Sequence, residues 1–268
     1  MNAVVFDLDD TLLHDDLTIS GFSVRVFRKL HEKGVFLIAA SGRSQLSMKP
    51  YIEQLGCVDA YIACNGAEIL EGASHRLIRQ EMIPADTASE IARYGERYGI
   101  YMHVYEGNRF FFNHGGIYAD RYAASSKLNG VCVGRLSDYI REPRNKILMV
   151  DRESRISRMY EEAVSLFDGR ANVTRSKPFY LEFAPAGTDK GAALGTVASV
   201  LGISTRDMIA FGDSPNDLPM FKAAGRAVAV SNGWAEILSC CDALCGSNEQ
   251  DGPARYLNDL FLNGEVLS

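Results

Sequence analysis

Two aspartates near the start of the chain have the spacing of a paired carboxylate site. Asp7 and Asp9 follow an apolar run at residues 3–6, and Asp10 and Thr11 stand beside them. An apolar run without alternation predicts a strand buried on both faces. Side chains at i and i+2 of a strand point the same way, so both carboxylates would project from its carboxyl end, where open α/β sheets bind ligands. Adjacent carboxylates repel unless a cation lies between them, and their hard oxygens suit Mg²⁺.

Further polar residues occur where other predicted strands end or predicted helices begin. Each of these positions could contribute to the same edge of a parallel sheet, because the carboxyl ends of parallel strands lie together. The residues are Ser41, Gly42 and Arg43 after a strand at 35–40, Lys190 at the start of a helix at 190–201, and Asp213, Asn216 and Asp217 after a strand at 208–211.

The elements between these residues alternate between strands and helices. In the first third we expect strands at 3–6, 35–40 and 61–64, with helices at 20–33 and 44–55 between them. The alternation returns near Tyr180. There we expect helices at 190–201, 218–224 and 254–262, strands at 208–211 and 227–230, and a helix starting at Trp234. This order predicts a doubly wound parallel sheet with right-handed crossovers.

The middle of the chain differs in residue composition and in the pattern of its predicted elements. Residues 83–177 are richer in aromatics, and strands at 100–105 and 109–112 flank Glu106-Gly107-Asn108, which is a hairpin signal. Helices are expected at 85–98, 117–128 and 154–167, and strands at 146–150 and 171–174. We interpret this segment as an α+β module inserted into the first domain.

Composition and charge limit the possible partners. The chain has 268 residues, 47% hydrophobic and 23% charged, with a net charge of −6. These values are those of a soluble globular protein, and without a Lys/Arg cluster a nucleic acid partner is not expected. We expect no membrane segment, no signal peptide, a cytoplasmic location, free cysteines, and a monomer or homodimer.

Taken in order, D-x-D-x-T, S-G-R, the lysine and G-D-S-x-N-D closely resemble the four signature motifs of the haloacid dehalogenase superfamily. The insertion resembles the class IIB cap, so the chain is most similar to the Cof-type phosphatases. The resemblance implies a Rossmann-like core formed by residues 1–82 and 178–268. Residues 83–177 would form the inserted α+β cap that sets substrate specificity.

The resemblance also implies a role for each motif residue. Asp7 would be the nucleophile that forms an aspartyl-phosphate, and Asp9 would be the general acid and base. The implied ligands of Mg²⁺ are Asp7, the backbone carbonyl of Asp9, and Asp213. Substrate phosphate would be bound by Ser41, Gly42, Arg43, Lys190 and Asn216, with Thr11 and Asp217 in supporting roles.

Several positions have more than one interpretation. Asp10 stands where this family more commonly has glycine, and it is either a tolerated loop variant or a weak extra acid. Arg43 could clamp substrate or pair with a surface carboxylate. Six side chains of the insertion could reach a substrate, although aromatics in such a module more often form its core. They are His103, Tyr105, Arg109, Tyr118, Arg144 and Lys146.

The leading functional hypothesis is a Mg²⁺-dependent phosphomonoester hydrolase. The resemblance implies a small substrate such as a sugar phosphate, a nucleotide or a phosphorylated cofactor. A phosphomutase of the same fold is one alternative, and dependence on a bisphosphate activator would distinguish it. A non-catalytic metabolite-binding protein is another, and it would show no turnover with a broad panel of phosphoesters.

Overall fold

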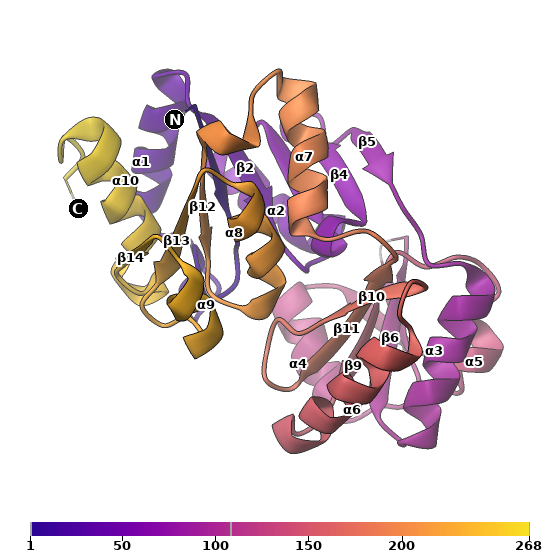
Figure 1. Cartoon of the computed structure of the whole chain (residues 1–268). Coiled ribbons are helices and arrows are strands. Elements are labelled where there is room, and N and C mark those ends of the chain that lie inside the picture. Colours follow the sequence, from indigo (N-terminus) through magenta and orange to yellow (C-terminus); the bar gives the residue numbers. More distant parts are fainter. Residues whose placement is uncertain (1, 108, 268) are drawn as a thin grey trace. The chain divides into compact units, whose positions relative to one another are not determined.

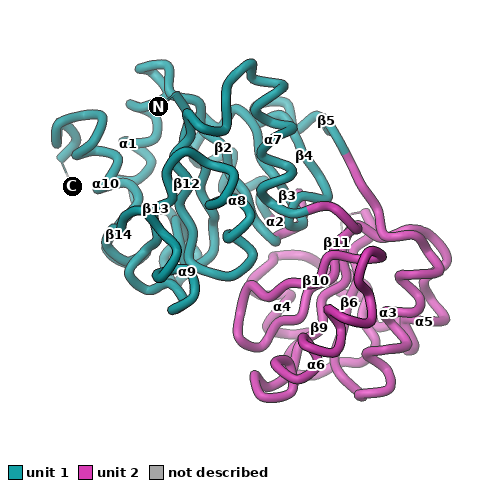
Figure 2. Tube along the Cα trace, in the orientation of Figure 1, with its two compact units in different colours: residues 1–42, 48–79, 189–268 teal, residues 43–47, 80–188 magenta. Residues whose placement is uncertain are grey.

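The computed structural model describes residues 2–107 and 109–267, and the chain forms two compact units (Figure 1). The first unit comprises Met1–Gly42, Met48–Arg79 and Asp189–Ser268, drawn in teal in Figure 2. The second comprises Arg43–Ser47 and Gln80–Thr188, drawn in magenta. Most of the second unit is thus a single insertion between two parts of the first.

The first unit is built on an eight-stranded sheet with the order β14-β13-β12-β1-β2-β3-β4-β5. The six strands from β14 to β3 are parallel, and β4 runs antiparallel to β3. Residue Ala3 of β1 pairs with Phe36 on one side and Met208 on the other, so β1 is a central strand. The strands are β1 (Ala3–Phe6), β2 (Phe36–Ala40), β3 (Ala60–Ala63), β4 (Glu68–Glu71), β5 (Leu77–Gln80), β12 (Met208–Gly212), β13 (Arg226–Val230) and β14 (Ala243–Cys245).

Helices cover both faces of this sheet, which confirms the predicted doubly wound fold. Val4 and Phe6 pack into a core with α1, α2 and α10, whereas Ala3 and Val5 face a second core with α7, α8 and α9. Because successive strand residues point to opposite faces, both cores need apolar side chains, which explains the uninterrupted apolar runs. The helices are α1 (Gly21–Glu32), α2 (Gln45–Leu55), α7 (Lys190–Leu201), α8 (Leu218–Ala223), α9 (Ala235–Cys240) and α10 (Gly252–Leu262).

The second unit has an α+β fold around a six-stranded sheet with the order β10-β11-β9-β6-β7-β8. Its strands are antiparallel except for the parallel pair β7–β8. One face packs against α3, α5 and α6, and the other carries an aromatic cluster under α4. The elements are α3 (Ala85–Arg97), β6 (Tyr101–Glu106), β7 (Arg109–Phe112), α4 (Ile117–Ser126), β8 (Asn129–Cys132), α5 (Leu136–Tyr139), β9 (Ile147–Val150), α6 (Glu153–Leu166), β10 (Ala171–Thr174) and β11 (Tyr180–Pro185).

Some elements differ from those that the sequence indicates. Residues 180–185, placed in the first domain above, form strand β11 and pair with β9 and β10 in the sheet of the second unit. The short elements β4, β5, β8, β14 and α5 are not among those that the sequence predicts. The predicted hairpin is present as paired β6 and β7, although Asn108 of its turn lies outside the described residues.

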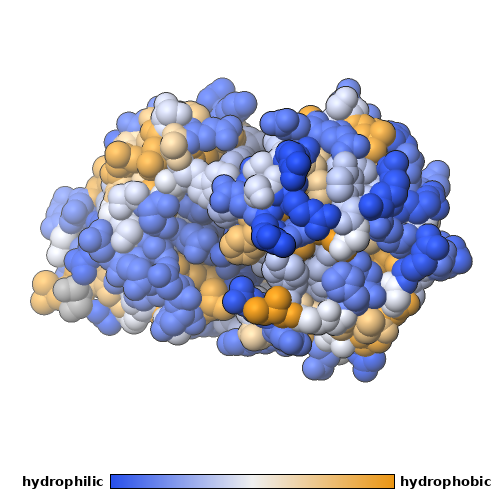
Figure 3. Space-filling view, turned by 90° about the horizontal axis from the view of Figure 1, so that it is seen from below, coloured by the Kyte–Doolittle hydropathy of each residue, from blue (hydrophilic) through white to orange (hydrophobic). Residues whose placement is uncertain are grey.

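The surface and the cysteines agree with the composition. On the face drawn in Figure 3, hydrophilic residues predominate and hydrophobic ones occur in small groups. Within the described ranges, no helix has the length and apolar character needed to span a bilayer. The six cysteines, all among the described residues, are free thiols.

Candidate active site

The site is centred on the carboxyl end of β1, where a buried lysine contacts two aspartates. Lys190 Nζ donates to Asp7 Oδ1 at 2.7 Å and to Asp217 Oδ1 at 2.6 Å, and all three side chains are buried. Lys190 is the first residue of α7, whose N-terminus is capped by the Asp189 carboxylate bonding to the N–H of Ala192. A lysine near the start of a helix is usually exposed to solvent. The complete burial of Lys190 therefore identifies it as part of the site.

Asp217 is held in place through both of its carboxylate oxygens. While Oδ1 accepts from Lys190, Oδ2 accepts from the backbone N–H groups of Asp213 (3.0 Å) and Ser214 (3.1 Å). Gly212 makes this approach possible, since a Cβ there would lie 2.6 Å from the Asp217 carboxyl carbon. Asp217 therefore orients the loop after β12 and the Lys190 ammonium at the same time.

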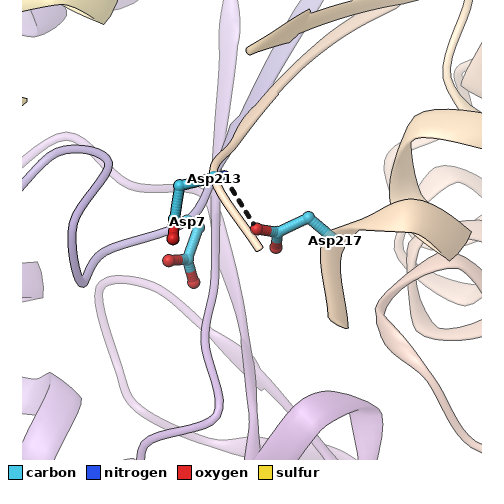
Figure 4. Close-up of side chains that lie close together, drawn as sticks. All are labelled: Asp7, Asp213 and Asp217. Carbon is cyan, nitrogen blue, oxygen red and sulfur yellow. Dashed lines mark hydrogen bonds between the residues drawn. The ribbon is translucent and has the colours of Figure 1, made fainter. Parts of the chain in front are cut away.

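A third aspartate completes the carboxylate group. Thr11 Oγ1 donates to Asp213 Oδ1 at 2.8 Å, joining the loops after β1 and β12. One carboxylate oxygen from each of Asp7, Asp213 and Asp217 lies within 4.8 Å of the others, and Figure 4 shows the three side chains close together. Asp7 and Asp213, which come from distant motifs of the sequence, therefore lie close together, with Asp217 as the third member of the group.

Electrostatics indicate that this group is short of positive charge. Burial is the main effect that raises the pKa of Asp7, to about 8, although Lys190 opposes it. Burial, together with Asp217 and Asp7, also raises the pKa of Asp213 well above its usual range. Burial alone would lower the pKa of Lys190, but Asp217 and Asp7 outweigh it and raise that pKa, so the lysine stays charged. Three buried carboxylates beside one ammonium fit a divalent cation with oxygen ligands.

The number of hydrogen bonds that each carboxylate accepts also indicates which of them could hold such a cation. Asp217 already accepts three hydrogen bonds, so it is suited to hold Lys190 and the loop after β12 in place. Asp7 accepts a hydrogen bond from Lys190 and Asp213 accepts one from Thr11, so these two carboxylates could hold the cation. Asp9 is half-buried, and its charge contributes to the raised pKa of Asp7, so it lies close to that carboxyl group.

The remaining predicted residues form a second branch of the site or stand outside it. Ser214 Oγ donates to Asn216 Oδ1 at 2.7 Å, and Asn216 Nδ2 donates to Asn65 Oδ1 at 3.0 Å. The backbone N–H of Asn65 in turn bonds to the carbonyl of Ser41, a buried residue that precedes Gly42. Arg43 donates instead to Ser47 Oγ and to the carbonyl of Ser125, within the second unit.

Asn65 is a site residue that sequence reasoning missed. It is buried and lies in the 3₁₀ turn η1 (Cys64–Gly66) directly after β3, with φ of 55°. Gly66, with φ of 105°, lets this turn pack on the backbone of Asp189, where a Cβ would lie 2.4 Å from the carbonyl oxygen. The available signal was the position of Asn65-Gly66 at the end of a predicted strand, but this dipeptide also favours an ordinary turn.

The chain thus has a doubly wound α/β core with an inserted α+β unit, and its buried lysine lies between carboxylates at the carboxyl edge of the sheet, where such sheets bind their ligands. Comparison with known families makes this specific. A family model described as haloacid dehalogenase-like hydrolase matches residues 4–257. The chain belongs to this family, which confirms the resemblance drawn from its motifs.

Individual relatives are similar over almost the whole chain. The 5-amino-6-(5-phospho-D-ribitylamino)uracil phosphatase YitU of Bacillus subtilis is 26% identical, with 96% of this chain and 97% of the relative covered. The crystal structure of a haloacid dehalogenase-like hydrolase from Bacteroides thetaiotaomicron has a TM-score of 0.84 at 26% identity, covering 97% and 99% of the two chains. A subclass IIB sugar phosphatase shares the fold, with a TM-score of 0.86, 18% identity, and 97% and 99% coverage.

Proposed function

We propose that this enzyme hydrolyses phosphate monoesters of small metabolites through an aspartyl-phosphate formed on Asp7. The observation that carries the proposal is the buried contact between Lys190 and Asp7. A carboxylate nucleophile would repel a phosphate dianion, and the ammonium at 2.7 Å offsets that repulsion at the reacting oxygen. The relatives named above include phosphatases for a ribityl phosphate and for sugar phosphates, which supports the same substrate class.

In the first step, an Asp7 oxygen attacks phosphorus and forms a new P–O bond while the bond to the leaving alcohol breaks. Asp9 gives its proton to the leaving oxygen. In the second step, Asp9 takes a proton from water as the water oxygen attacks phosphorus. The bond to Asp7 then breaks, which releases inorganic phosphate and restores the carboxylate.

The other side chains bind and orient. Ser41 and the Gly42 N–H would hold a phosphate oxygen, with Asn216 and Lys190 beside them, and Thr11 and Asp217 would fix Asp213 and Lys190. Asp7, the Asp9 carbonyl and Asp213 would hold Mg²⁺, which supplies charge neutralisation at the phosphoryl oxygens. Arg43 stays a proposed substrate contact.

We also propose that the second unit acts as the cap and sets substrate preference, supported by the class IIB resemblance and by its insertion into the first unit. Exchanging residues 80–188 for those of a relative should transfer substrate preference. Retention of the original preference would contradict this role.

A cytoplasmic location is proposed from the free thiols of the described residues.

The decisive experiment combines a panel of phosphorylated metabolites with trapping of the covalent intermediate. Acid quenching during turnover of a ³²P-labelled substrate should leave label on the protein, and hydroxylamine should remove it, as expected for an acyl phosphate. Asp7→Asn should remove both label and turnover while the protein still unfolds cooperatively on heating. Turnover that persists in Asp7→Asn would exclude the covalent route, and dependence on an added bisphosphate would indicate a mutase.

A further inference from the structure

The loop after β1, residues 8–20, must hold Asp9 in place, yet its backbone is strained next to that residue. The carbonyl of Leu8 accepts from the N–H groups of Leu12 and Leu13 at 3.0 and 2.8 Å, which closes a tight turn. Within this turn Asp10 has φ of 57°. The left-handed region is unfavourable for residues other than glycine, and although aspartate tolerates it better than most, surrounding contacts must hold Asp10 there.

Asn232, in the loop after β13, contacts that strained residue. Its Nδ2 donates to the carbonyl of Asp10 at 2.7 Å. The other end of the same amide, Oδ1, accepts from the backbone N–H of Asn248 at 3.1 Å. With donor and acceptor both assigned, the amide has one orientation and bridges the β1 loop to the 3₁₀ turn η4 (Asn248–Gln250).

Asn248 forms hydrogen bonds with the same loop three residues further along, at Leu13. Its side chain is buried, and its Nδ2 donates to the carbonyl of Leu13 and to Asp15 Oδ1, both at 3.0 Å. An amide NH₂ has two hydrogens, so this donor is fully used. The loop is thereby held at two carbonyls, those of Asp10 and Leu13, by two asparagines from the C-terminal part of the chain.

We propose that Asn232 and Asn248 are positioning residues that hold Asp9 in its general acid position, an inference that rests on the proposed phosphatase function. Neither side chain touches the reacting atoms. Asn232 bonds to the carbonyl of Asp10, the residue directly after Asp9, and Asn248 anchors the same turn at the carbonyl of Leu13. A shift of about 1 Å at Asp9 can cost on the order of 100-fold in rate. Loss of either amide should therefore impair proton delivery more than the attack by Asp7.

Leaving groups separate these two effects. An alkyl phosphate must release an alkoxide and needs a proton, whereas p-nitrophenyl phosphate releases a stable phenolate without one. We expect Asn232→Ala and Asn248→Ala to lower kcat about 10-fold for the best alkyl phosphate of the panel, and less than about 3-fold for p-nitrophenyl phosphate, with KM little changed. The ratio of the two rates is measured on one sample, so partial unfolding cancels.

Two further variants sharpen the test. Asn232→Asp keeps the acceptor for the Asn248 N–H but loses the donor to the Asp10 carbonyl, so it should behave like the alanine variant. Asn232 is exposed, whereas Asn258 is buried like Asn248 and also bonds to a loop, through Val266 N–H and C=O at 3.1 Å each, so it is the matched control for Asn248. Asn258→Ala should lower stability and leave the rate ratio unchanged.

Asp9→Asn serves as the reference and should show the largest selective loss with the alkyl phosphate. If Asp9→Asn shows this selectivity and Asn232→Ala lowers both rates equally, the positioning role is refuted and the proposed function stands. A change of the ratio in Asn258→Ala would also refute it. If the wild-type enzyme hydrolyses neither ester, the proposed function itself fails.

Discussion

The Lys190 ammonium lies 2.7 Å from Asp7 Oδ1, although 183 positions separate the two residues in the sequence. Both are buried, and the second carboxylate on the lysine, that of Asp217, is buried as well. Breaking a buried ion pair leaves charge without compensation and typically costs about 3–5 kcal/mol. The contact therefore matters for stability and for the chemistry.

We predict that Lys190→Met lowers kcat/KM by about 100-fold or more, because the variant loses the positive charge beside the nucleophile. It should also lower the free energy of unfolding, measured by urea denaturation. Lys222→Met is the control, because Lys222 is exposed and in the same unit. Wild-type kcat/KM in Lys190→Met would contradict the assignment of this lysine.

Thr11→Val should weaken the metal site without touching the nucleophile. The substitution keeps the shape of the side chain and removes the hydroxyl that donates to Asp213 at 2.8 Å. The Asp213 carboxylate then loses its orientation, and we expect a rise of about 10-fold in the Mg²⁺ concentration needed for half-maximal activity. Magnesium titrations of kcat check this. Thr18→Val, in an exposed turn of the same loop, should titrate like wild type.

Chelation should stop turnover reversibly, and metal affinity should depend on pH. Because burial raises the pKa of Asp7 to about 8, cation binding below that pH must displace protons from this carboxyl group. Affinity for Mg²⁺ should therefore rise as the pH increases to about 8. Calorimetric titrations in two buffers of different ionisation enthalpy should detect proton release. Activity that survives chelation would exclude the metal site.

The same raised pKa predicts how stability varies with pH in the metal-free protein. Between the ordinary value of 3.8 and about 8, the folded state binds more protons at Asp7 than the unfolded state. This contribution to stability is complete below 3.8 and is lost as the pH rises toward 8. Urea denaturation of the chelated protein should show the decline, and Asp7→Asn should reduce it.

His103, in the second unit, should make the protein less stable as the pH falls, which is opposite to the effect of Asp7. It is fully buried, its Nε2 lies 3.1 Å from Tyr105 Oη, and among described atoms its Nδ1 finds no hydrogen-bond partner. Burial, with a smaller contribution from Lys146, lowers its pKa well below 6.5. The unfolded state thus binds more protons below 6.5, so stability is lost as the pH falls. His103→Gln should reduce this loss between pH 7.5 and 5.5, whereas exposed His31→Gln should not.

Sequence patterns predicted the parts of the fold that depend on local chemistry. Continuous apolar runs specified the central strands because both faces of the sheet are covered. Polar residues at strand ends pointed to Asp7 and Asp213, and the start of a helix pointed to Lys190. Features that depend on contacts between residues distant in sequence were harder to predict. Strand β11 belongs to the sheet of the second unit through pairing with β9, which no local pattern encodes. The amides of Asn65, Asn232 and Asn248 look like turn residues in sequence, and only their partners show otherwise.

Strand β1 lies between β2 and β12 in the sheet, and this order has a consequence for biosynthesis. A nascent chain that has not yet reached Met208 exposes one side of β1 with no strand to pair against. By then residues 80–188 have been synthesised, and domains generally fold as units during synthesis. Catalytic competence should thus arise late in translation, and a truncated product ending before β12 should be inert and prone to aggregate.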